Sequence, residues 1–119
     1  MKEFDPGESA SIASVTDKVR PLPLGAAVSS VYFLGDNACF VGAEEKIFIA
    51  NPAGEVSTVE VHFGGILCST SDGTRIVTGG DDGKVVAFNA KGETSVLATD
   101  AKRRWIDCVA LHPDGAFAW

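Results

Sequence analysis

Residues 28–59 read VSSVYFLGDNACFVGAEEKIFIANPAGEVSTV, and residues 66–97 read ILCSTSDGTRIVTGGDDGKVVAFNAKGETSVL. The second stretch repeats the pattern of the first at an offset of 38 positions, which superposes Gly35 on Gly73, Gly42 on Gly80, Lys46 on Lys84 and Asn51 on Asn89. A third copy begins at Trp105 and runs to Trp119. A period of about 40 residues is typical of proteins built from like units that bury their faces against each other.

Each copy contains short runs of β-branched or aromatic residues that are separated by Gly, Asn or Asp. The runs predict strands at 29–33, 38–41, 46–50 and 56–63, at 66–70, 75–78, 84–88 and 94–98, and at 107–112 and 116–119. Asp72-Gly73 separates the first two runs of the second copy, and Asn89 to Gly92 separates its last two. Because such turns tolerate positive φ angles, they favour tight antiparallel hairpins. The sequence therefore predicts four antiparallel strands per unit and no helix.

Composition excludes several classes of protein. The chain has 119 residues, 45% of them apolar, and a net charge of −6, which favours one globular domain and argues against nucleic-acid binding. Three cysteines form no disulfide framework, so a reducing, cytoplasmic location is expected. The N-terminal residues lack a signal-peptide pattern, and no apolar run approaches the roughly 20 residues of a membrane helix, so no membrane partner is expected.

Four strands per unit of about 40 residues correspond to one blade of a β-propeller. Residues 105–115 (WIDCVALHPDG) resemble the first strand of WD-repeat propellers, and residues 75–89 (RIVTGGDDGKVVAFN) resemble the second and third strands. Phe88-Asn89 stands in place of the family's Trp-Asp pair, and Ala50-Asn51 is its counterpart in the first unit.

The Gly-His pair of WD-repeat blades is missing from this chain, so the polar network that joins His, Ser, Asp and Trp in those blades is only partly matched. His62 lies two residues too close to the Asp72-Gly73 turn for the family's Gly-His pair, and Lys102 occupies the equivalent place in the third unit. Only Asp81 and Thr78 match members of the network in the second unit.

The resemblance implies an all-β fold, a partial β-propeller of four-stranded antiparallel blades with two complete blades and a third begun. The blades are expected at 28–63, 66–99 and 105–119, within an incomplete WD-repeat-like propeller that covers 15–119 and follows a flexible leader at 1–14. Residues 19–24, which contain two prolines, are expected to be the outer strand of a closing blade. We expect the chain to be the N-terminal piece of a longer protein, prone to self-association through open strand edges.

Three patterns suggest chemistry, and each favours a structural role. A phosphate loop has four residues between its first Gly and a Gly-Lys pair, followed by Ser or Thr. Residues 79–84 (GGDDGK) have only three residues in between and are followed by Val85, so they predict a hairpin turn. Asp81 and Asp82 alone cannot supply the six to eight oxygens that Ca²⁺ requires. Cys108 and His112 share one side of a predicted strand, where a buried, inert cysteine is favoured over a nucleophile. No cofactor or metal site is expected.

The strongest candidate for a binding surface is the loop of Lys102, Arg103, Arg104 and Trp105, because Arg and Trp are enriched at binding hot spots. The resemblance implies that this loop shares one rim with Asp81 and Asp82 and with the matching turn of Glu44 and Glu45. In the alternative interpretation Trp105 packs between blades and the cations are merely solvated.

The resemblance favours a noncatalytic scaffold that binds a protein or peptide through these loops. The alternative is a propeller enzyme of hydrolase or lactonase type, whose central-channel site would use polar residues at the ends of first strands. Gly65 and Asp107 occupy those positions here, and only one of them is polar. Further blades beyond this chain would complete such a site.

Overall fold

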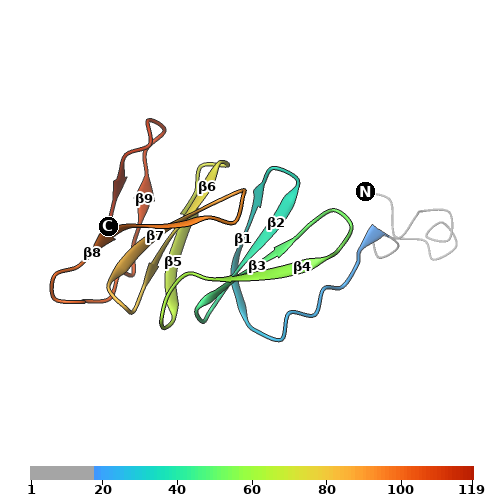
Figure 1. Cartoon of the computed structure of the whole chain (residues 1–119), viewed down its shortest axis with the longest axis horizontal. Helices are drawn as coiled ribbons and strands as arrows, with labels where there is room; N and C mark the ends of the chain where they lie inside the picture. The colour runs from blue at the N-terminus through green and yellow to red at the C-terminus, as the bar shows by residue number, and fades with distance from the viewer. Residues whose placement is uncertain (1–17) are drawn as a thin grey trace, which may run out of the picture.

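The computed structural model describes residues 18–119 and is almost entirely β-strand (Figure 1). The first sheet contains β1 (Val28–Leu34), β2 (Asn37–Gly42), β3 (Lys46–Ala50) and β4 (Val56–Glu60). The second contains β5 (Ile66–Ser71), β6 (Arg75–Gly80), β7 (Lys84–Asn89) and β8 (Thr94–Thr99), and a hairpin follows with β9 (Ala110–Leu111) and β10 (Phe117–Ala118). The leader predicted at 1–14 lies outside the described residues. In residues 18–119 no helix is long and apolar enough to cross a membrane.

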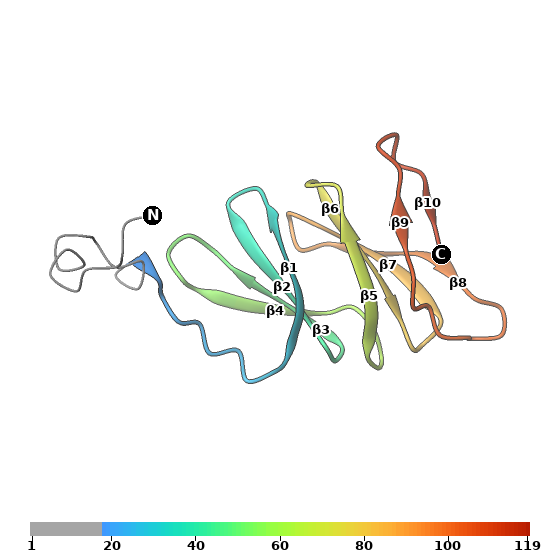
Figure 2. The ribbon, with the colours of Figure 1, turned by 180° about the vertical axis from the view of Figure 1, so that it is seen from behind.

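The two complete sheets are antiparallel meanders with the orders β1-β2-β3-β4 and β5-β6-β7-β8. They follow one another as successive blades, and the β9-β10 hairpin begins the next blade (Figures 1 and 2). The sequence repeat extends to local irregularities, because the ladder shifts register between Val28 and Ser30 in the first blade and between Ile66 and Cys68 in the second. The predicted partial β-propeller is therefore confirmed.

Each pair of neighbouring blades shares an apolar core. Between the first and second blades the buried side chains are Leu34, Cys39, Val41, Ile47, Ile66, Ile76 and Phe88. A second cluster, Val77, Val85, Ala87 and Ile106, joins the opposite face of the second blade to the β9-β10 hairpin. Side chains alternate along β6, so Ile76 faces one neighbour and Val77 the other. The second blade is thus covered by apolar contacts on both faces.

The tight turns predicted between the third and fourth strands of each blade are confirmed. Asn51 Oδ1 accepts a hydrogen bond from the backbone N–H of Glu55 at 2.9 Å, and Asn89 Oδ1 accepts one from Glu93 N at 3.0 Å. Gly92 adopts φ +81°, in the left-handed region that asparagine-glycine turns tolerate. Local side chains therefore supply hydrogen bonds that close these hairpins.

Three predicted strands are shorter than expected, and one is not formed. The run at 56–63 ends at Glu60, and beyond it the N–H groups of Val61 and His62 both donate to Glu45 O, at 2.9 and 3.5 Å. The run at 107–112 pairs only at Ala110 and Leu111, and the run at 116–119 pairs only at Phe117 and Ala118. Residues 19–24 form no strand. Arg20 instead donates a hydrogen bond to Pro52 O at 3.1 Å, which ties the segment to the β3-β4 turn.

Cys108 does not occupy the buried position predicted for it. The residue is exposed, and the neighbouring Ile106 fills the core in its place. Ile106 is held there by two hydrogen bonds: its N–H donates to Gly80 O at 3.0 Å, and its carbonyl accepts from Cys68 Sγ at 3.4 Å. These contacts fix the chain before the short β9 begins.

The outer face of the first blade exposes apolar side chains. Val31 and Phe33 are 54% and 70% exposed, and their cross-strand partners place them on the face opposite the inter-blade core. We therefore propose that this chain self-associates, and that the substitutions Val31→Thr and Phe33→Ser together shift it toward monomer in sedimentation velocity. Val96→Thr, at an exposed valine of β8, is the control. A compact wild-type monomer with a cooperative melting transition would contradict the proposal.

Candidate functional site

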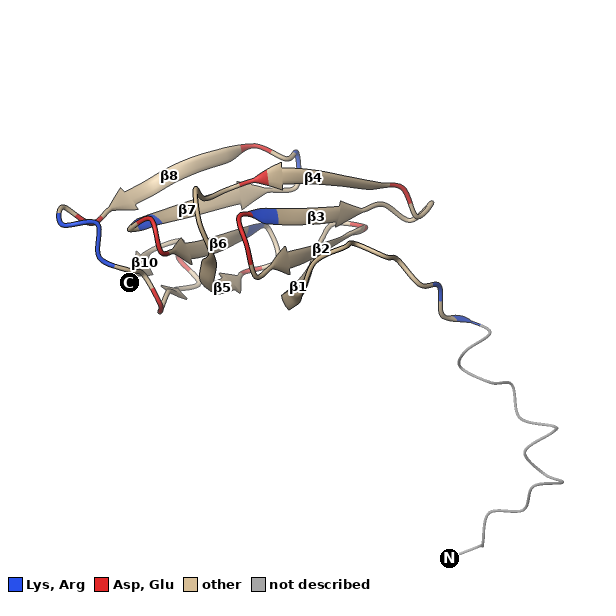
Figure 3. Ribbon diagram, turned by 90° about the horizontal axis from the view of Figure 1, so that it is seen from below, with Lys and Arg blue, Asp and Glu red and all other residues tan. Residues whose placement is uncertain are grey.

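Four connecting segments lie on one edge of the blades and are joined by backbone hydrogen bonds. We call residues 43–45, 61–65, 81–83 and 100–106 the rim. The bonds run from Ile66 N to Glu44 O at 3.2 Å, from Asp81 N to Gly65 O at 3.0 Å and from Asp100 N to Gly83 O at 2.7 Å. The acidic turns and the basic loop predicted as partner-binding residues are therefore neighbours along this edge, and Figure 3 shows their charges.

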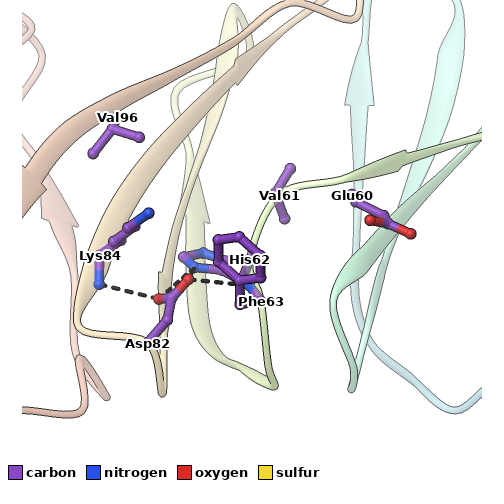
Figure 4. Close-up of a pocket in the computed structure, with 7 residues that line it drawn as sticks. All are labelled: Glu60, Val61, His62, Phe63, Asp82, Lys84 and Val96. Carbon is purple, nitrogen blue, oxygen red and sulfur yellow. Dashed lines mark hydrogen bonds and ion pairs between the residues drawn. The ribbon is translucent and has the colours of Figure 1, made fainter. Parts of the chain in front are cut away.

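A buried polar network lies beneath the rim (Figure 4). His62 Nδ1 lies 2.9 Å from Asp82 Oδ1, and His62 Nε2 lies 2.7 Å from Thr78 Oγ1. The His62 side chain is 0% exposed and that of Asp82 is 7% exposed. Because Nδ1 faces a carboxylate, it carries a proton and donates; in the neutral ring, Nε2 then accepts from the Thr78 hydroxyl. The network ties the 61–65 connection to β6 and to the β6-β7 turn.

The sequence assigns only Asp81 and Thr78 to a polar network and leaves His62 out of it. The structure joins His62 to Thr78 and to Asp82, so the assignment of Asp81 as the acidic member is wrong. Because β4 ends early, the connection that follows turns His62 inward over β6. Gly80 leaves the space for the ring, since a Cβ there would collide with His62 Nδ1. The Asp81 carboxylate instead lies against Gly64, where a Cβ would also collide with it. The paired glycines at 64–65 and 79–80 are the sequence signal that could have indicated this close approach.

The Asp82 carboxylate is stabilised in its ionised form. Burial raises its pKa, but hydrogen bonds from His62 and from the N–H groups of Phe63 (3.2 Å) and Lys84 (3.1 Å) outweigh that effect, so the pKa lies below its ordinary value. No buried side-chain polar atom of the described residues lacks a hydrogen-bond partner. The network is saturated and its histidine is inaccessible, so it is suited to fixing the rim and not to contacting a substrate.

A small open pocket of about 170 Å³ lies beside the network. Its lining comprises Glu60, Val61, His62, Phe63, Asp82, Lys84 and Val96 (Figure 4). Phe63 is 90% exposed, and Lys84 Nζ lies 5.3 Å from the centre of its ring, within the range of a cation–π interaction. The rim therefore displays an aromatic ring next to a cation.

The basic loop is organised by Asp100. The carboxylate of Asp100 accepts hydrogen bonds from Lys102 N (3.0 Å) and Arg104 N (2.9 Å), and from Arg104 Nε (3.1 Å) and Nη2 (2.9 Å). Hydrogen bonds from Arg104 hold the pKa of Asp100 at about 2. Lys102 and Arg103 form no ion pair within residues 18–119. Of the three predicted cations, only Arg104 is therefore in an ion pair within the described residues.

Trp105 is on the surface, 71% exposed. Trp105 does not pack between blades, as the alternative interpretation has it. Ile106 instead occupies the core between the second blade and the β9-β10 hairpin. The γ2 methyl of Ile106 lies so close to Gly79 that a Cβ added to Gly79 would be 2.5 Å from this methyl group. A tryptophan would need more room at this point than the second blade leaves.

The other candidate residues are not assembled into a reactive site. His112 Nδ1 lies 3.0 Å from Asp114 Oδ1 and accepts a hydrogen bond from Asp114 N at 3.2 Å, so the polar contacts of the imidazole lie within the β9-β10 turn. Burial raises the pKa of the Cys39 and Cys68 thiols, which makes both less reactive. In the part of the chain that the structure describes, no group of three His, Cys, Asp or Glu residues is placed to hold a metal ion.

The site thus combines a buried polar network with a surface edge that presents Phe63, Lys102, Arg103 and Trp105. No known family model matches this chain, and no match was found among curated proteins or solved structures.

Proposed function

We propose that the chain is a noncatalytic scaffold that binds an extended segment of another protein along the rim. One observation carries this proposal. Loops from successive blades are hydrogen-bonded into a continuous edge, and that edge exposes two aromatic side chains, Phe63 and Trp105. Large aromatic and arginine side chains supply most of the free energy at protein interfaces.

The rim is also rigid enough to bind without a large entropic cost. Backbone hydrogen bonds and the His62–Asp82 contact fix its connections before any partner arrives. The resemblance to WD-repeat propellers supports the same function, and the buried His62–Thr78–Asp82 arrangement adds to that resemblance. We further propose a cytoplasmic location, because all three cysteines are unpaired.

The proposal predicts that Trp105→Ala weakens peptide binding. An array of synthetic peptides of varied sequence, probed with the whole labelled chain, identifies binders whose affinities are then measured in solution. We expect Trp105→Ala to reduce the affinity about tenfold or more, as for a hot-spot tryptophan. Trp119→Ala is the matched control, because Trp119 is also exposed but lies outside the rim.

The two tryptophan variants give a clear outcome. Peptides that lose affinity with Trp105→Ala and keep it with Trp119→Ala support binding at the rim. The proposal is wrong if no peptide binds, or if Trp105→Ala leaves every measured affinity unchanged.

A further inference from the structure

We propose that the bound segment is acidic where it meets the basic loop, and that Lys102 and Arg103 pair with its carboxylates beside Trp105. This inference rests on the proposed function and specifies its partner. The basic residues of the loop are three of only ten in a chain of net charge −6. Because they are consecutive, they form a concentrated positive region on an otherwise acidic protein, which favours one orientation of an acidic partner.

Two of the three cations of the loop, Lys102 and Arg103, have no partner within residues 18–119. Arg104 is held by Asp100 in a two-point ion pair with a contact of 2.9 Å. Lys102 and Arg103 are exposed, and their side chains make no hydrogen bond or ion pair with residues 18–119. An ammonium and a guanidinium without internal partners are suited to the carboxylates of another chain.

The loop holds Arg103 in a backbone conformation that the surroundings impose. Its φ is +54°, the only positive value among the non-glycine residues of the described chain. The Arg103 N–H donates to Asp100 O at 2.9 Å, and the Asp100 N–H donates to Gly83 O at 2.7 Å. Strained backbone of this kind persists where neighbouring structure overdetermines it. The loop is therefore ordered on folding, and little further ordering is needed on binding.

A protein segment suits this surface better than a nucleic acid. The same edge carries Glu44 and Glu45, and Asp107 lies exposed just beyond the loop. A long polyanion would meet these carboxylates and the net negative charge, and the two loop cations without an ion pair in residues 18–119 could neutralise few of its phosphates. An acidic stretch within a longer protein segment can contact the basic loop alone, and a neighbouring apolar group of the same segment can pack on the exposed face of Trp105.

Fluorescence anisotropy with a fluorescein-labelled oligoglutamate peptide tests the inference. We expect the whole chain to bind oligoglutamate more tightly than an oligoglutamine peptide or a labelled oligothymidine, with weakening at higher salt. In the Trp119→Phe background, binding should also change the fluorescence of Trp105. The double variant Lys102→Gln, Arg103→Asn should lose about tenfold in affinity.

The variants are chosen to keep the fold. Asparagine tolerates the left-handed conformation of Arg103, and an unchanged unfolding midpoint of the double variant would show that the loop is intact. Lys91→Gln is the matched control, because Lys91 lies on the β7-β8 turn and outside the rim. It should bind oligoglutamate as the wild type does.

Each outcome bears on the inference or on the proposed function separately. The inference is overturned if oligoglutamate does not bind, if the double variant binds it unchanged, or if oligothymidine binds more tightly. If the array meanwhile yields neutral or basic peptides whose binding depends on Trp105, the rim still binds proteins and only the partner class is wrong. If no peptide depends on Trp105, both proposals fail.

Discussion

Replacing Asp82 with alanine is expected to lower the free energy of unfolding by about 3 kcal/mol, the cost of breaking a buried charge-assisted pair. The substitution would leave His62 Nδ1 without its partner at 2.9 Å, and it would also remove the acceptor for the N–H groups of Phe63 and Lys84. Urea denaturation followed by circular dichroism measures the change.

The neighbouring aspartate provides the control. Asp81→Ala removes a carboxylate from the same turn, but one that accepts no hydrogen bond from residues 18–119, so we expect a loss of less than about 1 kcal/mol. Equal losses for the two variants would contradict the assignment of Asp82 to the network.

The pH dependence of stability provides a second readout. The pKa of Asp82 is lowered in the folded chain, so its ionised form stabilises the fold above the unfolded pKa of about 3.9. This contribution is lost as the pH falls through the lower folded value. Asp82→Asn keeps an acceptor oxygen but cannot ionise, and it should therefore reduce the acid dependence of unfolding in this range.

Gly83→Ala is expected to destabilise the fold by about 3 kcal/mol, through backbone strain and overpacking together. Gly83 has φ +77°, and a Cβ there would lie 2.7 Å from Arg103 Cα and 2.9 Å from Arg103 C. Both contacts are with backbone, so no side-chain rotation relieves them. The basic loop would have to move away from the β6-β7 turn.

Gly92→Ala separates the two causes. Gly92 has a similar φ of +81°, but nothing lies within 4 Å of the added Cβ. Strain alone should cost this variant about 1 kcal/mol. A comparable loss in both variants, measured by the same urea titration, would show that contact between Gly83 and the loop contributes nothing.

Much of the fold follows from local chemistry, which is why the sequence predicts it. The third strand of the first blade, β3, begins and ends where predicted, at Lys46 and Ala50. Its boundaries are set by turn residues on either side, and the hydrogen bond of Asn51 to Glu55 N needs no distant partner. Where the strands and turns of one unit are encoded within a few residues of each other, the 38-residue repeat reproduces them in the next.

The features that sequence reasoning missed depend on contacts between distant segments. His62 joins Asp82 and Thr78, which lie 20 and 16 residues further along the chain, and it can do so only because β4 ends early. Likewise, whether Trp105 or Ile106 enters the core depends on the space beside Gly79. Strand periodicity contains no information on either choice.

The 61–65 connection belongs to two blades at once. Its first residue, Val61, is bonded to the β2-β3 turn of the first blade, whereas Gly65 accepts from Asp81 in the second. In repeat proteins, stability is approximately the sum of unit terms and nearest-neighbour coupling terms. Here the coupling includes these backbone hydrogen bonds as well as apolar contact, so unfolding of one blade would remove hydrogen bonds that stabilise the next. The backbone amides of both blades would then exchange with solvent in the same opening event.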